Sequence, residues 1–438
     1  MANVTRTSSP GQGTPPRRRS TARALVGGTI GNFVEWFDWS VYGFFAVYFA
    51  DQFFPGGNAV LSTLLVFAIS FFMRPVGAAV LGTYADRHGR KHGMTLTILL
   101  MAGGSLVIGI APTYDQVGWL APAVLVLGRL LQGFSTGGEF GTSASFLVEW
   151  AKPGRKAFAG SFQQVSVVLG ILLASLSATV LTRVLDDAQL ESWGWRIPFL
   201  IGSVIGLVGL YIRRQIDEPD AFRSLDRATQ AASSPLGDMA RGHRRGAALV
   251  FGISIAGSVI TYMWLTYLPT YATLTAGADR ADGQLANTIA LAVFAVLIPL
   301  AALLSDRFGR RPTMLVYAAL FVVLPFPLMQ LLGSSFTSIL VVSVIGVAVL
   351  SLNHANLATV FAELFPPQVR TIGIAVPYAV SNAVFGGTAP SVMQFFGDRD
   401  VLWVVPLYVS ICALVTGFTI WKMPETRDVD TSATGRTA

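Results

Sequence analysis

Charge and cysteine are both scarce in this chain of 438 residues. Asp, Glu, Lys and Arg together make up 13% of it, whereas 53% is hydrophobic and the mean hydropathy is +0.57. A water-soluble fold does not need so much apolar surface for its core, so a membrane protein is expected. The one cysteine, Cys412, lies inside an apolar segment, which excludes a disulfide within the chain and gives no sign of a redox site.

Motifs for cofactor and metal chemistry are also missing. The chain has no G-x-x-x-x-G-K-[ST] phosphate loop and no cluster of metal ligands. His88 and His92 are four residues apart, but they stand in a basic stretch without further ligands, so no metal site is expected. These absences disfavour an enzyme and an ATP-driven pump, and no cofactor is expected.

The apolar residues occur in runs of about twenty or more, the length that crosses roughly 30 Å of hydrocarbon at 1.5 Å per residue. An all-α membrane protein is therefore predicted, and its fourth and tenth segments are long enough to tilt or to project into water. The twelve predicted transmembrane helices are Ala24–Ala50, Val60–Thr83, Gly93–Ala111, Trp119–Trp150, Ala157–Leu185, Ile197–Ile212, Ala247–Thr273, Leu285–Leu304, Thr313–Leu332, Ser338–Phe365, Thr371–Phe395 and Val401–Trp421.

Basic residues indicate the orientation, because basic loops are retained on the cytoplasmic side. With both termini inside, 25 of the 31 Lys and Arg fall in cytoplasmic segments, and Arg74 and Arg129 lie within helices. We therefore predict a multi-pass protein of the cell inner membrane with both termini in the cytoplasm. The net charge of +7 then faces anionic lipid, and no nucleic-acid partner is implied. The four remaining arginines fall outside: Arg183, Arg196, Arg280 and Arg399.

Composition divides the chain into two halves and three polar segments. Residues 1–22 are rich in Ser, Gly, Pro and Arg and are expected to be a disordered cytoplasmic tail. A cleaved signal peptide is not expected, because the first apolar stretch is too long and contains Glu35 and Asp38. The predicted division is a six-helix bundle at 23–214, a cytoplasmic linker at 215–245, a second six-helix bundle at 246–423 and a tail at 424–438.

The two halves carry an internal repeat in matching positions. A loop with Asp86, Arg87, Gly89 and Arg90 follows the second predicted helix, and a loop with Asp306, Arg307, Gly309 and Arg310 follows the eighth. Two more pairs agree: Glu149 before Arg155 with Glu363 before Arg370, and Asp217-Glu218-Pro219 with Pro424-Glu425-Thr426. Matched halves of this kind are the architecture of alternating access about a site near the bilayer midplane.

The sequence resembles the major facilitator superfamily, whose loop signature G-x-x-x-D-R-x-G-R-[RK] is met from Gly82 to Lys91. Within it the chain is similar to the metabolite:proton symporters, through Gly31 to Asp38, Met73-Arg74-Pro75, Gln132 to Glu139 and Trp193 to Pro198. The segments Gly141 to Ala144, Phe162-Gln163 and Tyr378 to Gly387 look closest to the 2-oxoglutarate and organic acid permeases. The resemblance implies the major facilitator fold and proton-coupled symport of a small solute.

Ionisable side chains inside the bilayer cost at least about 2.5 to 3.5 kcal/mol each, so they usually mark a pathway or a paired site. The candidates for proton coupling or substrate binding all fall in the N-terminal half: Glu35, Asp38, Arg74, Arg129 and Glu139. Glu35 or Asp38 is a candidate proton acceptor, the alternative being a carboxylate permanently paired with Arg74. Glu139 stands among glycines, where helix packing is the simpler explanation.

The two membrane arginines suit an anionic substrate. Arg129 matches the fourth-helix arginine that the resemblance links to proton coupling, although a structural ion pair is the alternative. Polar or amphipathic residues within the predicted helices are expected to line a cavity, although Trp and Tyr are also common interfacial anchors. These candidates are Asn32, Trp39, Tyr42, Gln163, Gln164, Tyr262, Tyr267, Tyr378 and Asn382.

The repeated loops are predicted to form a cytoplasmic gate, because they place carboxylates beside arginines at helix ends. Positive-inside loops need arginine in any case, but the acidic partners exceed that need. The predicted networks join Asp86 to Arg90, Glu149 and Arg155, and Asp306 to Arg310, Glu363 and Arg370. Gly82, Arg87 and Gly89 complete the first loop.

We predict a symporter that imports a small organic acid, with 2-oxoglutarate or a related dicarboxylate favoured. Its partners would be this solute, protons and the lipid bilayer, and it is expected to act as a monomer. A carrier for a zwitterionic osmolyte of the proline or betaine type, or for an aromatic or hydroxy acid, is the alternative. A channel is disfavoured because paired halves with gates suit alternation better than a continuous pore, and a receptor would normally carry a sizeable soluble domain.

Overall fold

The computed structural model describes residues 21–56, 59–215, 235–397, 399 and 401–429. The predicted tail at 1–22 and the predicted linker at 215–245 lie mostly outside these residues, as does Asp217-Glu218-Pro219. The predicted tail at 424–438 is described only as far as Val429.

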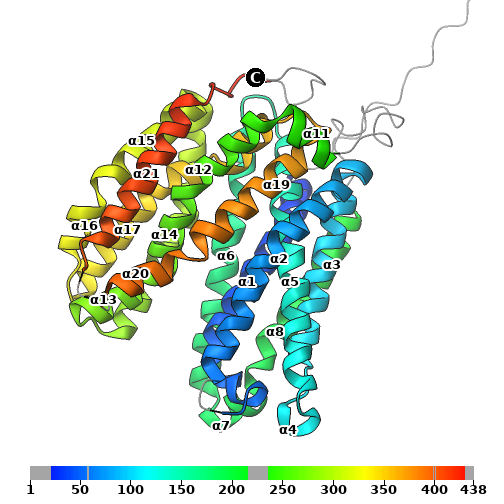
Figure 1. Cartoon of the computed structure of the whole chain (residues 1–438), viewed down its shortest axis with the longest axis vertical. Coiled ribbons are helices and arrows are strands. Elements are labelled where there is room, and N and C mark those ends of the chain that lie inside the picture. Colours follow the sequence, from blue (N-terminus) through cyan, green and yellow to red (C-terminus); the bar gives the residue numbers. More distant parts are fainter. Residues whose placement is uncertain (1–20, 57–58, 216–234, 398, 400, 430–438) are drawn as a thin grey trace, which may run out of the picture.

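The N-terminal half consists of helices joined by short loops (Figure 1). The long helices α1, α2 and α5 have 33, 30 and 30 residues, more than a bilayer crossing needs. Their order is α1 (Thr21–Phe53), α2 (Ala59–His88), α3 (Arg90–Gly109), α4 (Tyr114–Val117), α5 (Leu120–Glu149), α6 (Lys156–Val184), α7 (Asp187–Gln189), the π-helical turn η1 (Leu190–Gly194) and α8 (Arg196–Arg214).

The C-terminal half is also helical throughout its described part, but its helices are more often interrupted. The order is α11 (Pro235–Gly242), α12 (Arg244–Tyr262), the π turn η2 (Met263–Tyr267), α13 (Leu268–Ala276), α14 (Arg280–Phe308), α15 (Arg310–Val323), α16 (Pro325–Leu331), α17 (Phe336–His354), α18 (Leu357–Glu363), α19 (Arg370–Ser381), the π turn η3 (Asn382–Gly386), α20 (Ala389–Gly397) and α21 (Val404–Lys422).

Each of the twelve predicted crossings coincides with helices of the described residues. Among the described residues, eight helical segments are long and apolar enough to cross on their own, and a ninth crossing is α15 with α16, which are bent by 54° at Pro325. The other three crossings are α1, which carries the buried Glu35 and Asp38, α5, which carries the buried Arg129 and Glu139, and α19 with α20, which η3 interrupts. The tenth predicted helix, from Ser338 to Phe365, breaks after His354 into α17 and α18.

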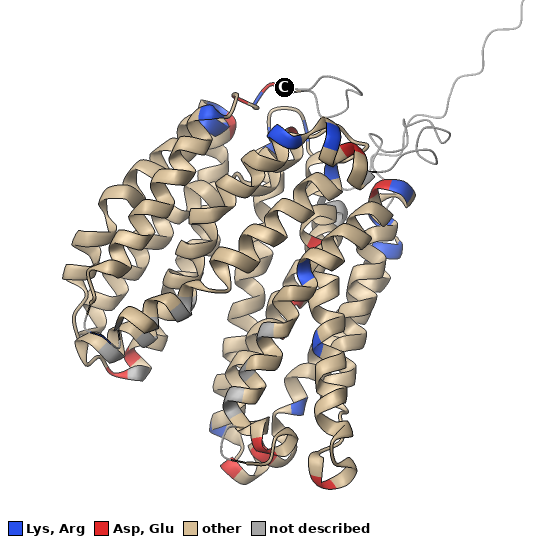
Figure 2. Cartoon of the chain, in the orientation of Figure 1, with Lys and Arg blue, Asp and Glu red and all other residues tan. Residues whose placement is uncertain are grey.

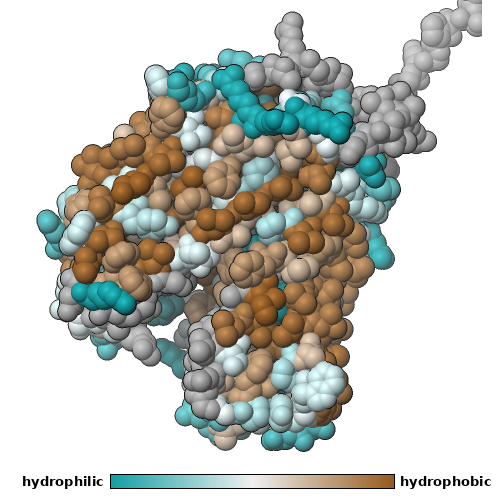
Figure 3. Space-filling view, viewed as in Figure 1, coloured by the Kyte–Doolittle hydropathy of each residue, from teal (hydrophilic) through white to brown (hydrophobic). Residues whose placement is uncertain are grey.

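The charged residues gather at the ends of the helices, and Lys and Arg are concentrated at one end (Figure 2). The starts of α1 and α3 and the end of α8 share this end, because Arg213 donates to the carbonyl of Gly27 and Lys91 to that of Arg214. Large apolar side chains such as Phe72, Leu207 and Phe418 cover the flanks, each more than half exposed. Figure 3 shows this apolar surface over the length of both halves. A surface of this kind fits contact with lipid tails.

The two halves meet through α2 with α19 and through α6 with α14. Gly82 on α2 is one reason for this close approach, since a Cβ added there would lie 3.3 Å from the Cα of Ile372 on α19. The halves are joined at the basic end and part at the other end (Figure 3). If the basic end is cytoplasmic, this is an outward-facing arrangement.

Candidate functional site

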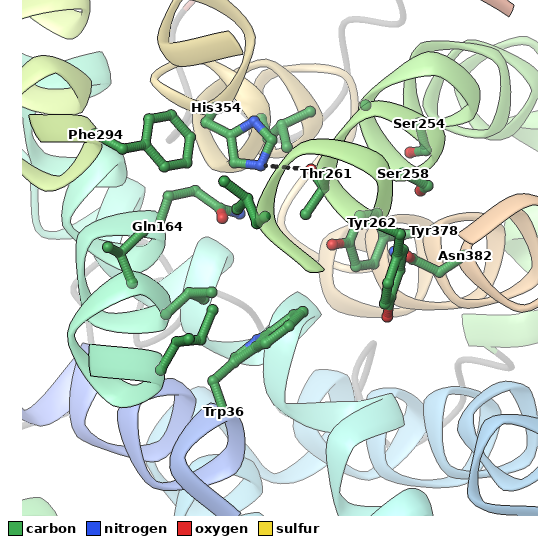
Figure 4. A pocket seen from close by; sticks show the side chains of 16 residues that line it. Trp36, Gln164, Ser254, Ser258, Thr261, Tyr262, Phe294, His354, Tyr378 and Asn382 are labelled. Carbon is green, nitrogen blue, oxygen red and sulfur yellow. Dashed lines mark hydrogen bonds between the residues drawn. The ribbon is translucent and has the colours of Figure 1, made fainter. Parts of the chain in front are cut away.

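A narrow cavity lies between the halves (Figure 4), with about 40 Å³ of room for the centres of water-sized molecules. Trp36 of α1 and Gln164 of α6 line it from the N-terminal half, beside the apolar Val167, Val168 and Ile171. Polar groups line it from the C-terminal half, namely Ser254, Ser258, Thr261, Tyr262, His354, Tyr378 and Asn382.

Two π turns position part of this wall. Tyr262 immediately precedes η2, and Asn382 is the first residue of η3. A π turn inserts an extra residue into a helix, and such turns are often found at functional sites. Gly386, which ends η3, leaves room for Tyr262, because a Cβ on Gly386 would lie 2.7 Å from the tyrosine ring. The interrupted helices α12 and α19 thereby bring their polar side chains to one cavity.

An aromatic contact closes the cavity toward the basic end. The rings of Phe140 on α5 and Tyr378 on α19 are stacked with their centroids 3.8 Å apart. The next small residue of α5, Gly141, abuts the carbonyl of Thr371, and a Cβ there would lie 2.6 Å from that oxygen. The two halves are therefore in direct contact just beyond the cavity.

Arg74 and Glu35 form the charged group next to the cavity. The Arg74 guanidinium lies 4.1 Å from the ring centre of Trp39 and 4.5 Å from that of Phe71, and it contacts the hydroxyl of Tyr262. Glu35 is 4% exposed and has Arg74 as its strongest charged neighbour. Among the described residues no ion pair joins Arg74 to Glu35, so the permanent pair considered as an alternative is not formed in this state.

Arg129 and Asp38 lie deeper in the N-terminal half and are joined through a neutral amide. Arg129 is fully buried and donates to the Gln132 side-chain oxygen at 2.7 Å, while the Gln132 nitrogen donates to Asp38 at 3.5 Å. Asp38 also accepts from the hydroxyl of Ser105. The guanidinium lies 4.3 Å from the ring centre of Tyr42, so within the described part of the chain Arg129 has aromatic and amide neighbours instead of an ion-pair partner.

Glu139 is held by a partner that the sequence did not indicate. The fully buried Arg213 of α8 forms an ion pair with Glu139, and Thr97 of α3 donates a hydrogen bond to the same carboxylate. Arg213 also donates to the carbonyls of Gly27 and Met94. This network ties four helices together at the basic end of the N-terminal half. The sequence placed Arg213 just beyond the end of the sixth predicted helix, and the structure includes it in α8 with its side chain buried.

The nine predicted cavity residues separate into three groups. Gln164, Tyr262, Tyr378 and Asn382 line the cavity. Trp39 and Tyr42 surround the two arginines instead. The remaining three are buried elsewhere in the described structure: Asn32 donates to Ser143 at 2.7 Å, Gln163 donates to the carbonyl of Phe140 at 3.1 Å, and Tyr267 packs near Tyr271.

The first repeated loop binds a helix of the other half. Asp86 accepts hydrogen bonds from the backbone nitrogens of Thr371 and Ile372, the second and third residues of α19, at 3.1 and 2.9 Å. Arg90 donates to Asp86 at 2.6 Å and to the carbonyl of Pro367 at 2.5 Å. A carboxylate at a helix N-terminus is favourable because the free N–H groups and the helix dipole point at it. These bonds close the basic end between α2 and α19.

The second loop makes the same kind of contact with the roles of the two halves exchanged. Asp306 accepts from the backbone nitrogens of Ala157 and Phe158, the second and third residues of α6, both at 3.0 Å. Arg310 donates to Asp306 at 2.8 Å. The glycines of both loops have matching positive φ angles, 111° at Gly89 and 108° at Gly309, in a region that favours glycine. The repeat in sequence is therefore a repeat in geometry.

The predicted grouping of the gate arginines was wrong. Arg370 pairs with Glu149 at 2.5 Å and thereby joins the Asp86 network, across the halves, instead of the Asp306 network. Arg155 is exposed and does not take part in the Asp86 network. Glu363, which lies 3.5 Å from Arg310, accepts a 2.7 Å hydrogen bond from Thr426. Arg87 is exposed at the end of α2.

Several site residues were missed in the sequence, for different reasons. Gln132, Ser105 and Thr97 are uncharged, and the sequence gives no signal of which carboxylate they contact. Arg213 stands next to Arg214 at a helix end, where a basic residue is expected to face water. His354 was not considered, although it is a titratable residue within an apolar run and could have been found on that ground. The described residues contain no group of three or more His, Cys, Asp or Glu that could hold a metal ion.

Twelve crossings in two matched halves, a cavity between them and reciprocal contacts at one end define a membrane transporter of the alternating-access type. The model of the Sugar (and other) transporter family matches residues 25–234 and 220–434. The chain belongs to this family of the major facilitator superfamily, so it is a multi-pass membrane transporter.

Named relatives extend this result. The chain is 42% identical to the alpha-ketoglutarate permease of Escherichia coli (strain K12), over 90% of this chain and 92% of that one. It is 33% identical to the citrate-proton symporter of Salmonella typhi, over 94% and 96%. It is 34% identical to a Staphylococcus aureus (strain COL) protein whose name assigns it to proline or betaine transport, over 92% and 88%.

Solved structures agree with the fold. The proton:xylose symporter XylE bound to 6-bromo-6-deoxy-D-glucose has a TM-score of 0.77 at 17% identity, covering 93% of this chain and 96% of that one. Its partially occluded inward open conformation has a TM-score of 0.66 at 18% identity, covering 93% and 98%. The predicted major facilitator fold is thereby confirmed.

Proposed function

We propose that the chain is a proton-coupled symporter that imports a small organic acid, with 2-oxoglutarate or a related dicarboxylate favoured. The observation that carries this is the environment of Arg74 and Arg129. Both guanidiniums are buried and share a neighbour, Trp39, whose ring centre lies 4.1 Å from Arg74 and 4.6 Å from Arg129, and each retains a nitrogen without a hydrogen-bond partner among the described residues. The 42% identity to a permease named for alpha-ketoglutarate supports the substrate class.

Arg74 is the proposed cation for the substrate, because its neighbour Tyr262 lines the cavity. A carboxylate that enters the cavity would form charge-assisted hydrogen bonds with this guanidinium. Glu35 is the proposed proton acceptor, since it adjoins Trp36 of the cavity wall and shares Arg74 as its neighbouring cation. Substrate and Glu35 would then compete for one arginine, and protonation of Glu35 would remove the competing negative charge beside Arg74.

Asp38 and Arg129 are proposed to couple this step to helix movement. Their link through Gln132 has no direct ion pair, so either charge can change its partner without breaking a salt bridge. Glu139 is assigned to helix packing in this proposal, because Arg213 and Thr97 already hold its carboxylate.

The crossed contacts of Asp86 and Asp306 are the proposed cytoplasmic gate. They hold the basic end closed while the cavity faces the other side, and they must separate when the halves, proposed as 23–214 and 246–423, rock into the inward-facing state. The concentration of Lys and Arg at this end supports a cytoplasmic location for it and for both termini. Both halves of the cavity belong to one chain, which supports action as a monomer in the inner membrane.

A carrier of proline or betaine is the second candidate. A relative named for that function is 34% identical over 92% of this chain, and Trp36, Tyr262 and Tyr378 around the cavity are suited to a quaternary ammonium group. The dicarboxylate is favoured because the chain is 42% identical to the permease named for alpha-ketoglutarate, against 34% for this relative.

Uptake into vesicles tests both candidates. The protein is reconstituted and given labelled 2-oxoglutarate, succinate or betaine under an inward proton gradient. We expect accumulation of a dicarboxylate that a protonophore abolishes. Accumulation that persists without the gradient would refute proton coupling, and accumulation of betaine without any dicarboxylate would refute the substrate assignment.

A further inference from the structure

We propose that His354, with Thr261, is the anchor in the C-terminal half for the second carboxylate of the substrate. The transported acid would then be held at two ends, by Arg74 from one half and by the imidazole from the other. The inference rests on the proposed function, and it names the residues that separate dicarboxylates from monocarboxylates.

His354 occupies a defined place in the cavity wall. It is the last residue of α17, is 6% exposed, and lies where the tenth crossing breaks before α18. Its Nε2 lies 3.1 Å from the hydroxyl of Thr261 on α12, and its ring packs edge to face on Phe294 of α14 with 5.3 Å between ring centres. Figure 4 shows the ring edge with Nε2 toward the interior, on the side where Gln164 of the other half also points. Three helices thus orient one imidazole at the cavity.

The scarcity of ionisable residues in the C-terminal half singles out His354 as a partner for an anionic substrate. The predicted crossings of the C-terminal half contain no Asp, Lys or Arg, and their one Glu, Glu363, belongs to the gate. Among the described residues that line the cavity, His354 is the only side chain that can become a cation. An ionisable residue is costly inside a membrane and is seldom retained there without a function. A dianion between the halves would therefore meet the Arg74 guanidinium on one side and, on the other, an imidazole that can donate a hydrogen bond.

The hydrogen bonds already present indicate how the contact forms. The imidazole Nδ1 has no hydrogen-bond partner among the described residues. Nε2 faces Thr261 alone, so a carboxylate oxygen can take the place of the threonine hydroxyl at Nε2. The hydroxyl can then donate to the same carboxylate. Because α12 and α17 contribute one group each, this exchange would also draw the two helices around the substrate.

A selectivity measurement tests the proposal. Uptake of labelled 2-oxoglutarate into vesicles is measured for wild type, H354L, H354Q and T261A, with glutarate and 2-oxobutyrate as competitors. The first competitor has both carboxylates, and the second keeps the 2-oxo acid end and lacks the distal carboxylate. We expect H354L to raise the KM for 2-oxoglutarate and the inhibition constant of glutarate by about tenfold or more, because a hydrogen bond to a charged group is lost. The inhibition constant of 2-oxobutyrate should change by less than about twofold, which is well below the change expected from the loss of one such hydrogen bond.

The remaining variants separate binding from structure. H354Q keeps a hydrogen-bond donor and should lie between wild type and H354L, and T261A should shift selectivity in the same direction by a smaller factor. S343A is the control, since Ser343 is buried on the same helix but does not line the cavity. If H354L does not reach the membrane, H354Q and T261A carry the comparison.

The outcomes distinguish this inference from the proposed function. If the His354 variants weaken the binding of glutarate and 2-oxobutyrate equally, or weaken the binding of neither, the His354 anchor is overturned. The proposed symporter would remain intact. A wild-type protein that accumulates no dicarboxylate would overturn the proposed function itself.

Discussion

Asp86 on α2 accepts a 2.9 Å hydrogen bond from the backbone nitrogen of Ile372, near the start of α19 in the opposite half. The bond joins a carboxylate of one bundle to the N-terminus of a helix in the other. It is therefore made only while the two halves are closed at this end, and its free energy favours that state over the inward-facing one.

The substitution Asp86→Asn should weaken the closed state. The loss of a charge-assisted contact to two N–H groups is expected to cost roughly 1–3 kcal/mol. Turnover should fall several-fold while the KM for the substrate changes less than about twofold, because the cavity is untouched. Asp306→Asn is the matched variant, since Asp306 makes the same two contacts to α6.

The closed state can also be followed without transport. Ser145 of α5 is fully buried and lies 3.4 Å from the Thr371 hydroxyl of the other half. In a background with Cys412→Ser, a cysteine introduced as S145C should react faster with a cytoplasmic thiol reagent when Asp86→Asn is added. Identical labelling rates and turnover would contradict the role of Asp86 in closing this end.

Removal of the Arg129 guanidinium should stop coupled transport. Arg129→Ala is expected to abolish accumulation driven by the proton gradient and to leave insertion into the membrane intact. The stacking on Tyr42 and Trp39 and the bond to Gln132 depend on a planar guanidinium, so Arg129→Lys should not restore accumulation. The measurement is gradient-driven uptake beside the amount of purified protein. Wild-type uptake by Arg129→Ala would remove this residue from the mechanism.

The pair of Glu139 and Arg213 should be structural. Arg213→Ala leaves a buried carboxylate without its partner, which is expected to destabilise the protein by about 3–5 kcal/mol. The double substitution Glu139→Gln with Arg213→Met should recover most of this loss, because no buried charge then remains. Thermal unfolding in detergent measures both. If Arg213→Ala unfolds like wild type but has lost transport, the pair belongs to the transport cycle instead.

The glycines of the repeated loops should be sensitive to a single methyl group. Gly89→Ala and Gly309→Ala place a side chain at φ near +110°, which is expected to cost about 1–3 kcal/mol at each position. Gly103→Ala on α3 is the control. It has helical backbone and open space at the Cβ position, so it should be neutral or stabilising by about 0.5–1 kcal/mol. Equal melting temperatures for the three variants would show that the loop conformation is not strained by alanine.

The twelve crossings could be predicted because each depends on a long apolar run, which is a property of local sequence. The repeated Asp-Arg-x-Gly-Arg loops could be predicted for the same reason. The breaks at η2, η3 and His354 could not, since a π turn or a kink depends on what the helix packs against. They are nevertheless what places Tyr262, Asn382 and His354 at the cavity.

Partners between distant segments were the least predictable part of the site. Symmetry suggested that Glu363 and Arg370 act within one network, but Arg370 reaches Glu149 in the other half. Arg213 was counted among the cytoplasmic basic residues because its neighbour is Arg214, whereas helix α8 turns it inward to Glu139. Sequence spacing gives the face of a helix, but it does not give the depth at which that face meets another helix.

The reciprocal capping by Asp86 and Asp306 makes the interface between the halves self-complementary. Each half offers a carboxylate and receives one at the second and third residues of a helix, as in a dimer with a two-fold axis. A six-helix polypeptide with one such loop could satisfy the same bonds by associating with an identical copy. Fusion of two copies into one chain would have kept every one of these contacts and left each bundle free to diverge, one toward buried charge and the other toward a neutral cavity wall.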